Sequence, residues 1–230
     1  MEPQTHRHPA TRALVTGATR RLGAAIAERL GREGARLALH YRGDETGRER
    51  TGARLTAAGV EHTWHRADLA DPEACTKLVD AAHDALGGVD LLVNNAAMFR
   101  RTPIETMTVE DFDRQMAVNA RPVYLLSQAA GLAMRPAGGA IINLADISAE
   151  RPWPTHIPYC ASKAAVVNMT RSFAKALAPT VRVNAVSPGA ALAPENAADG
   201  SGTRDGLIPG ESGAEAIAAA VSMLARARYV

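Results

Sequence analysis

The stretch that most constrains this chain is a short apolar run that leads through a glycine turn into a helical repeat. The run Ala-Leu-Val at 13–15 stops at a small-residue turn containing Gly17, and apolar residues then recur at helical spacing as Leu22, Ile26 and Leu30. A strand followed by a tight turn and a helix start leaves backbone N–H groups free at the positive end of the helix dipole. The pattern therefore predicts an anion site suited to phosphate.

Strand and helix alternate through the rest of the chain. Further strands are predicted at 36–41, 60–66, 89–93, 140–144 and 181–186, and helices at 45–58, 71–87, from Thr108 onward, 158–177 and 215–225. This alternation predicts an α/β fold, a single Rossmann-type doubly wound parallel sheet with helices on both faces. We expect a flexible tail over 1–11 and one domain over 12–230, whose segment 190–213, rich in Ala, Gly, Pro and Asp, forms a variable substrate lid.

Composition excludes several classes of function. The 230 residues carry 26 Lys and Arg against 24 Asp and Glu, a net charge of +2, which argues against nucleic-acid binding. No apolar run approaches a membrane span. The two cysteines, Cys75 and Cys160, suggest neither a metal site nor a disulfide framework. A cytoplasmic protein with a small-molecule substrate and no bound metal is expected.

Tyr159 and Lys163 stand four residues apart on a predicted helix and therefore share one face. A phenol with a pKa near 10 is a poor acid at neutral pH. A neighbouring ammonium lowers that pKa, so this spacing suits a tyrosine general acid. The pair alone also occurs by chance.

Other polar residues gather at predicted strand ends, where ligands bind in parallel sheets. Asn95 ends the strand at 89–93, Asp146 and Ser148 follow the strand at 140–144, and Asn119 lies within a predicted helix. If that strand extends, its alternation places Ser148 on the same side as Asp146. Each of these residues could instead serve as a local cap or turn.

As a set, these motifs resemble the short-chain dehydrogenase/reductase family over about residues 12–225. The motifs that carry the resemblance are Thr16-Gly17-x5-Gly23, Asn94-Asn95-Ala96, Asn119, Tyr159-x3-Lys163 and Pro188-Gly189. Within the family the chain looks most like pteridine reductases. They share an arginine in place of the middle glycine of the turn (Arg21), the strand end His40-Tyr41-Arg42, an aspartate at the usual catalytic serine (Asp146) and a phenylalanine after the Asn-Asn-Ala turn (Phe99).

The resemblance implies roles for these residues. Tyr159, Lys163, Asp146 and Asn119 would be catalytic, with Lys163 also binding the nicotinamide ribose and Asn119 positioning Lys163 through water. The implied cofactor residues are Gly17, Arg20, Arg21, Leu22, Gly23, Tyr41, Arg42, Asp68, Leu69, Asn95, Ala96, Pro188 and Gly189. Phe99, Ser148 and Arg21 would contact substrate. Arg42 and Arg20 favour NADPH over NADH, because arginine accepts a ribose 2′-phosphate, whereas Asp44 favours NADH.

An aspartate in place of serine suits substrates with ring N–H or amino groups, because a carboxylate accepts their hydrogen bonds. We therefore expect NADPH-dependent reduction of a C=N bond in a flat, pterin-like or iminium heterocycle. A carbonyl reductase of a biosynthetic intermediate and a non-catalytic NADP-binding sensor are the alternatives. Relatives continue into a final strand that this sequence lacks, and they imply a homo-oligomer, a dimer or tetramer.

Overall fold

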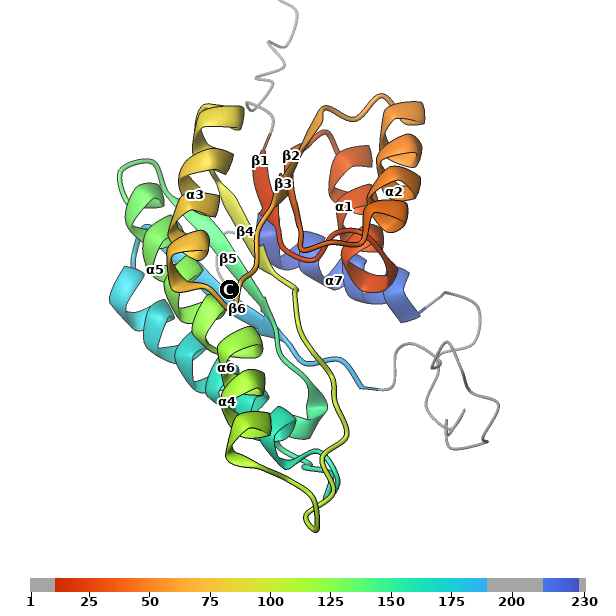
Figure 1. Ribbon diagram of the computed structural model, residues 1–230. Coiled ribbons are helices and arrows are strands. Elements are labelled where there is room, and N and C mark those ends of the chain that lie inside the picture. Colours follow the sequence, from red (N-terminus) through yellow and green to blue (C-terminus); the bar gives the residue numbers. More distant parts are fainter. Residues whose placement is uncertain (1–10, 190–212, 228–230) are drawn as a thin grey trace, which may run out of the picture.

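The structure is a computed structural model that describes residues 11–189 and 213–227. Its centre is a six-stranded parallel sheet in the order β3-β2-β1-β4-β5-β6 (Figure 1). The strands are β1 (Arg12–Val15), β2 (Arg36–Tyr41), β3 (His62–Arg66), β4 (Leu91–Asn94), β5 (Gly139–Leu144) and β6 (Val181–Val186). The strand order reverses direction between β1 and β4, which is the switch point at which such sheets bind ligands. The expected doubly wound sheet is confirmed.

Helices cover both faces of the sheet. The helices are α1 (Arg21–Arg32), α2 (Glu45–Ala57), α3 (Pro72–Leu86), α4 (Val109–Asn119), α5 (Arg121–Met134), α6 (Ile157–Leu177) and α7 (Gly213–Arg226). One core cluster joins the sheet to α1 and α7 through residues such as Ile26 and Val221, and a second joins it to α3 and α5 through residues such as Val79 and Leu126. Both faces of the central strands are therefore buried, which explains their continuous apolar sequences.

The helix predicted from Thr108 divides into two. The capping box of Thr108 and Asp111 is present as expected. The helix breaks at Ala120, directly before Arg121 and Pro122 begin α5. Proline lacks a backbone N–H and cannot continue the preceding helical ladder. Asn119, expected within a helix, is consequently the last residue of α4.

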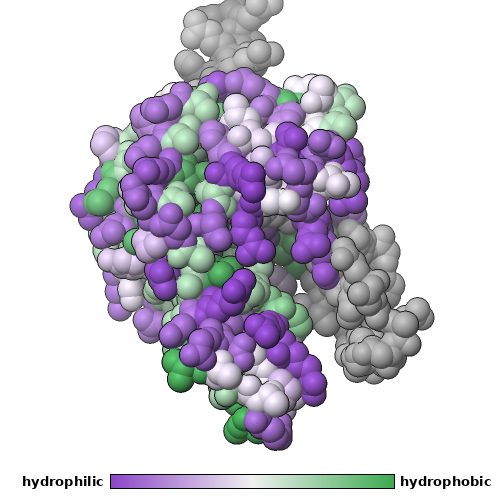
Figure 2. Space-filling model, in the orientation of Figure 1, coloured by the Kyte–Doolittle hydropathy of each residue, from purple (hydrophilic) through white to green (hydrophobic). Residues whose placement is uncertain are grey.

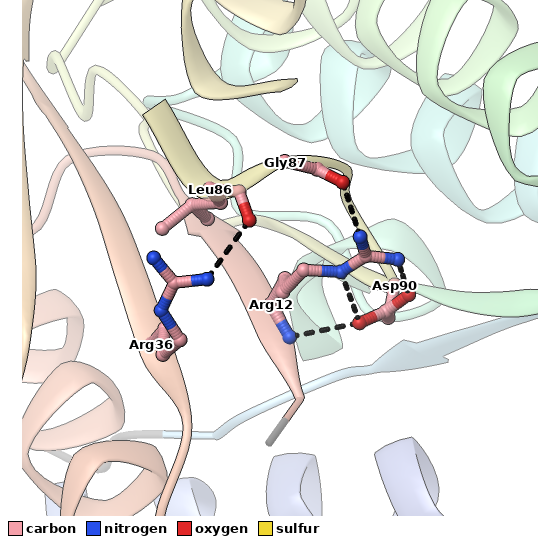
Figure 3. Close-up of polar contacts among 5 residues, drawn as sticks. All are labelled: Arg12, Arg36, Leu86, Gly87 and Asp90. Carbon is pink, nitrogen blue, oxygen red and sulfur yellow. Dashed lines mark hydrogen bonds and ion pairs between the residues drawn. The ribbon is translucent and has the colours of Figure 1, made fainter. Parts of the chain in front are cut away.

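The amino ends of the strands are tied together by arginines (Figure 3). Arg12 donates through Nε and Nη2 to the two carboxylate oxygens of Asp90 at 2.9 and 2.6 Å, and it also contacts the carbonyl of Gly87. Arg36 donates to the carbonyl of Leu86 at 2.9 Å. These contacts join β1 and β2 to the end of α3. They lie at the end of the sheet opposite to the strand ends discussed below.

Several expectations concern segments outside the described residues. The expected tail 1–11 lies outside the described residues except for Thr11. The expected lid 190–213 lies outside them except for Gly213, which begins α7. Within residues 11–189 and 213–227, no helix is long and apolar enough to cross a membrane, and no group of three or more His, Cys, Asp or Glu could hold a metal ion. The face shown in Figure 2 is mostly hydrophilic, with scattered apolar residues.

Candidate active site

The turn after β1 has the backbone that close approach to a phosphate requires. Gly17 adopts a positive φ of 66°. A Cβ on Gly23 would lie 2.0 Å from the carbonyl oxygen of Gly17, so only glycine allows α1 to pack this closely on the turn. Arg21, at the position of the usual middle glycine, has a φ of 49°. A non-glycine residue in this region costs about 1–3 kcal/mol and is typical of functional sites.

The first turn of α1 is left open for an anion. Its N-cap residue, Arg20, makes no side-chain capping bond, and no acidic residue lies in the first turn. Arg20 and Arg21 are exposed beside it, and Leu22 is partly buried. Free helix amides flanked by two guanidinium groups form a donor set that suits a pyrophosphate.

Asn95 holds the turn from the side of β4. Its Nδ2 donates to the carbonyls of Thr16 at 2.8 Å and Gly17 at 3.1 Å. The backbone amides of Asn95 and Ala96 donate to the Thr16 hydroxyl at 2.9 and 3.0 Å. The Asn95 side chain, expected to line the nicotinamide, is engaged with the turn itself. Its main contribution in this structure is to fix the turn's carbonyls.

The ends of β2 and β3 lie on the other side of the turn. Arg42 is exposed and Tyr41 is half-buried beside it. Asp44 caps α2, because its Oδ1 accepts a hydrogen bond from the amide of Gly47 at 3.0 Å. Asp44, the residue expected to favour NADH, is therefore occupied as the cap of α2. Arg42 remains the residue of this strand end suited to bind a 2′-phosphate.

Asp68 and Leu69, expected near the adenine, occupy different environments. Asp68 is exposed, and its Oδ1 accepts from the amide of Ala70 at 3.0 Å. Leu69 is 5% exposed and its side chain packs in the core. Only the backbone of Leu69 is thus left to meet a ligand.

Tyr159 and Asp146 meet at the carboxyl end of β5. The Tyr159 hydroxyl donates a hydrogen bond to Oδ2 of Asp146 at 2.9 Å. Lys163, one helical turn further along α6, donates through Nζ to the carbonyl of Leu144 at 2.7 Å, and Nζ lies 5.8 Å from the centre of the Tyr159 ring. The three polar side chains expected to act together are therefore adjacent.

The expectation that Lys163 lowers the pKa of Tyr159 is wrong for this structure. Burial, followed by the charge and hydrogen bond of Asp146, raises the pKa of Tyr159 well above its usual value. Burial also lowers the pKa of Lys163 to about 8, against the opposing charge of Asp146. The carboxylate lies closer to the phenol than the amine does, and the amine faces a carbonyl. Tyr159 is consequently held protonated.

Asp146 is fixed by a short turn, the local role that the sequence left open as an alternative for this residue. Residues Ile147–Ala149 form a 3₁₀ turn in which the amide of Ser148 donates to Oδ1 of Asp146 at 2.8 Å. The extended alternation expected to align Ser148 with Asp146 does not occur, because β5 ends at Leu144. Ser148 is 1% exposed, and its hydroxyl has no hydrogen-bond partner among the described residues.

Asn119 supports the site from a distance. Its Oδ1 accepts from the amide of Met98 at 2.7 Å, and its Nδ2 lies within 2.9 Å of the Met98 carbonyl and 3.1 Å of the Ser162 hydroxyl. The side chain thus joins α4 to the loop after β4 and to α6. No direct bond from Asn119 to Lys163 is present in the described structure.

An aromatic cluster borders Tyr159. The exposed Phe99 stacks on His156, with ring centres 4.5 Å apart and planes at 9°, and meets Tyr159 edge-on at 4.8 Å. Trp153 lies edge-on to Phe99 at 6.0 Å. Phe99 was expected here, whereas His156 and Trp153 were not singled out. The aromatic residues just before Tyr159 in the sequence were the signal available.

Pro188 and Gly189 follow β6 at the same edge. The carbonyl of Pro188 accepts from the amide of Ile147 at 3.0 Å, so this segment lies against the turn that carries Asp146. Gly189 is exposed. The glycine turn, Asn95, Asp146 and Pro188 therefore follow the carboxyl ends of the strands, and Tyr159 and Lys163 reach the same edge from α6.

Comparison with known proteins agrees with this geometry. The family model described as "Enoyl-(Acyl carrier protein) reductase" matches residues 17–226. A 3beta-hydroxysteroid dehydrogenase 1 of Eggerthella lenta is 37% identical over 229 residues, covering 94% of this chain and 88% of that protein. The chain belongs to the short-chain dehydrogenase/reductase family.

Solved structures of short-chain dehydrogenases/reductases superpose on nearly the whole chain. A short-chain dehydrogenase/reductase from Serratia marcescens has a TM-score of 0.84 at 34% identity, covering 97% of this chain and 95% of that one. A short chain dehydrogenase from Burkholderia cenocepacia in complex with NADP has a TM-score of 0.85 at 35% identity, covering 95% and 91%. These relatives are varied, and they do not single out pteridine reductases.

The family uses a nicotinamide cofactor, and the residues of this chain fit one. The uncapped start of α1 and the close approach of Gly23 to Gly17 form a cradle for a pyrophosphate. The described chain is thus an oxidoreductase whose polar cluster and dinucleotide-binding turn lie at the same edge of the sheet.

Proposed function

We propose that this protein is an NADPH-dependent reductase that transfers hydride to a C=N bond of a flat, pterin-like or iminium heterocycle. The observation that carries the proposal is the hydrogen bond from the Tyr159 hydroxyl to the Asp146 carboxylate. A carboxylate at this place accepts hydrogen bonds from ring N–H and amino groups, which a serine hydroxyl does less strongly.

The protonation of Tyr159 suits reduction. Bound NADPH would supply the hydride to the ring carbon. The ring nitrogen must then take up one proton, and the Asp146–Tyr159 pair is placed to provide it, with replacement from solvent. Because burial and Asp146 raise the pKa of Tyr159, the phenol carries its proton at neutral pH. Lys163 would bind the nicotinamide ribose after leaving the Leu144 carbonyl.

Phe99 supports a flat substrate. The residue is 60% exposed and its ring stacks on His156, so the aromatic surface is already oriented. Stacking of a planar heterocycle on such a ring contributes about 1 kcal/mol beyond burial. Arg21, whose backbone is held in the left-handed region, would bridge the pyrophosphate and a polar group of the substrate.

The preference for NADPH rests on Arg42 and Asp44. Arg42 is exposed at the end of β2, and Asp44 is engaged with the amide of Gly47. The NADP bound to the Burkholderia cenocepacia relative supports the same preference.

Reduction of a carbonyl is a second candidate. It is favoured by the similarity to the 3beta-hydroxysteroid dehydrogenase of Eggerthella lenta, an enzyme named for a hydroxyl group rather than a C=N bond. NADPH consumption at 340 nm, compared between dihydrobiopterin or dihydrofolate, cyclic imines and a ketone panel, separates the two. Turnover confined to ketones would overturn the C=N proposal. NADPH binding without oxidation by any substrate would favour a sensor.

We also propose that the protein is a homo-oligomer. Phe112 on α4 and Tyr124 and Leu132 on α5 are large apolar residues that are 43%, 45% and 53% exposed. A second copy that packs on these helices would bury them. Light scattering coupled to gel filtration tests this, and a monomer at micromolar concentration would contradict it.

A further inference from the structure

His40 connects two parts of the nucleotide-binding edge through its side chain. It is the fifth residue of β2 and is 2% exposed. Its Nδ1 accepts a hydrogen bond from the amide of Gly17 at 3.1 Å, and its Nε2 lies 3.0 Å from the carbonyl of Ala67. Its own carbonyl accepts from the amide of Ala18 at 3.0 Å. His40 therefore accepts hydrogen bonds from two consecutive backbone amides of the glycine turn, those of Gly17 and Ala18.

These contacts determine the protonation state of the ring. An amide N–H can only donate, so Nδ1 must present its lone pair to Gly17, and Nε2 must then carry the hydrogen that bonds the Ala67 carbonyl. A doubly protonated ring would oppose two donors at Gly17. Burial, helped by the charge of His65, lowers the pKa of His40 to about 4, against the opposing effects of the Ala67 bond and the charge of Asp68. The ring is neutral at physiological pH.

The turn is thus held from both sides. Asn95 binds its carbonyls from β4, and His40 binds its amides from β2. The same imidazole ties the turn to Ala67, directly before Asp68 on the adenine side. The ring therefore adds a side-chain link between the glycine turn and the end of β3 to the backbone bonds that already join them.

We propose that His40 is a positioning residue for the dinucleotide, and that its unprotonated Nδ1, as the acceptor for Gly17, is the atom on which cofactor affinity depends. The proposal rests on dinucleotide binding at this turn and is independent of which substrate is reduced.

Two substitutions test the two ring nitrogens of His40 separately. In His40→Asn the amide oxygen takes the place of Nδ1 and keeps the acceptor for Gly17. In His40→Gln the longer amide reaches the place of Nε2 and keeps the donor to Ala67. NADPH affinity is measured by fluorescence titration at a temperature where circular dichroism shows each variant folded. His65→Asn, on the neighbouring strand and bonded to Thr63, is the control.

The expected result is a dissociation constant raised about tenfold or more in His40→Gln, and less than about threefold in His40→Asn and the control, because an unpaired, part-buried amide in the turn costs more than a lost partner of the Ala67 carbonyl. Unchanged affinity in His40→Gln, or equal losses in both variants, would overturn the proposal. If the wild-type protein binds no dinucleotide, the proposed function fails instead.

A measurement on the wild-type protein avoids any folding defect. The ¹⁵N chemical shifts of the imidazole distinguish its tautomers. We expect the Nε2–H form to persist from about pH 8 to about pH 5, because the folded pKa lies below the usual value near 6.5. An Nδ1–H tautomer, or proton uptake near pH 6.5, would contradict the assignment.

Discussion

The hydroxyl of Tyr159 donates its hydrogen bond to the carboxylate of Asp146 at 2.9 Å. Lys163 meanwhile binds the carbonyl of Leu144, and the amide of Ser148 holds the other oxygen of Asp146. The phenol is therefore coupled to a fixed negative charge and stays protonated. In this geometry Tyr159 holds a proton that it would donate during reduction.

Removing the Tyr159 hydroxyl tests the proton donor. Tyr159→Phe keeps the aromatic contact with Phe99 and removes the proton. We expect kcat to fall by about 10²–10⁴, the usual contribution of a general acid, with little change in NADPH affinity. Steady-state rates and a fluorescence titration measure the two quantities. Near wild-type turnover would show that the proton comes from elsewhere.

Removing the charge of Asp146 tests the coupling. Asp146 raises the pKa of Tyr159, so Asp146→Asn lowers that pKa and lets the phenol deprotonate at a lower pH. The charge of Asp146 also holds up the pKa of Lys163, so both groups lose their protons at lower pH in Asp146→Asn, and the alkaline limb of kcat/KM should move to lower pH. Asp146→Ser, which restores a hydroxyl, should favour ketones over C=N substrates. An unmoved alkaline limb would mean that another group controls it.

Arg42 is expected to decide between NADPH and NADH. Arg42→Ala removes the guanidinium at the end of β2 and should reduce the NADPH preference about tenfold, the loss of one charge-assisted hydrogen bond. Comparing KM for the two cofactors measures the ratio. Arg32→Ala, at the far end of α1, is the matched control. An unchanged ratio would remove Arg42 from the cofactor site.

Because His40 is neutral in the folded protein, the free energy of unfolding should fall as the pH is lowered. Its folded pKa of about 4 lies below the value of about 6.5 in an unfolded chain, so the unfolded chain takes up the proton first as the pH falls. The stabilisation is fully present above about pH 6.5 and is lost down to about pH 4, by at most about 3 kcal/mol. Urea unfolding of the wild type and His40→Asn across this range measures the difference. Parallel curves would contradict it.

The ion pair of Arg12 and Asp90 should affect stability alone (Figure 3). Burial acts to raise the pKa of Asp90, but the hydrogen bonds and charge of Arg12 lower it overall. Both side chains are about a third exposed, so we expect a coupling free energy of only about 1 kcal/mol in a double-mutant cycle. The kcat of each variant should equal that of the wild type, because the pair lies at the opposite end of the strands. A reduced kcat in either variant would contradict the expectation that this ion pair affects stability alone.

The order of the elements and the edge of the sheet that bears the site could be read from the sequence. Apolar runs and helical spacing are local patterns, and parallel strands bring their carboxyl ends to one edge. Tyr159 and Lys163 were recognised because four residues make one helical turn. The division at Ala120 was missed because the pattern continues on both sides of Pro122.

Only the tertiary structure decided which polar atoms form hydrogen bonds with one another. Asp146 and Tyr159 are 13 residues apart, and Gly17 and His40 are 23 apart. Strand register and helix packing set these distances, and neither is encoded in a local repeat. Electrostatics follow from burial and contact, so the raised pKa of Tyr159, caused first by its burial and then by Asp146, could be seen only in the folded structure.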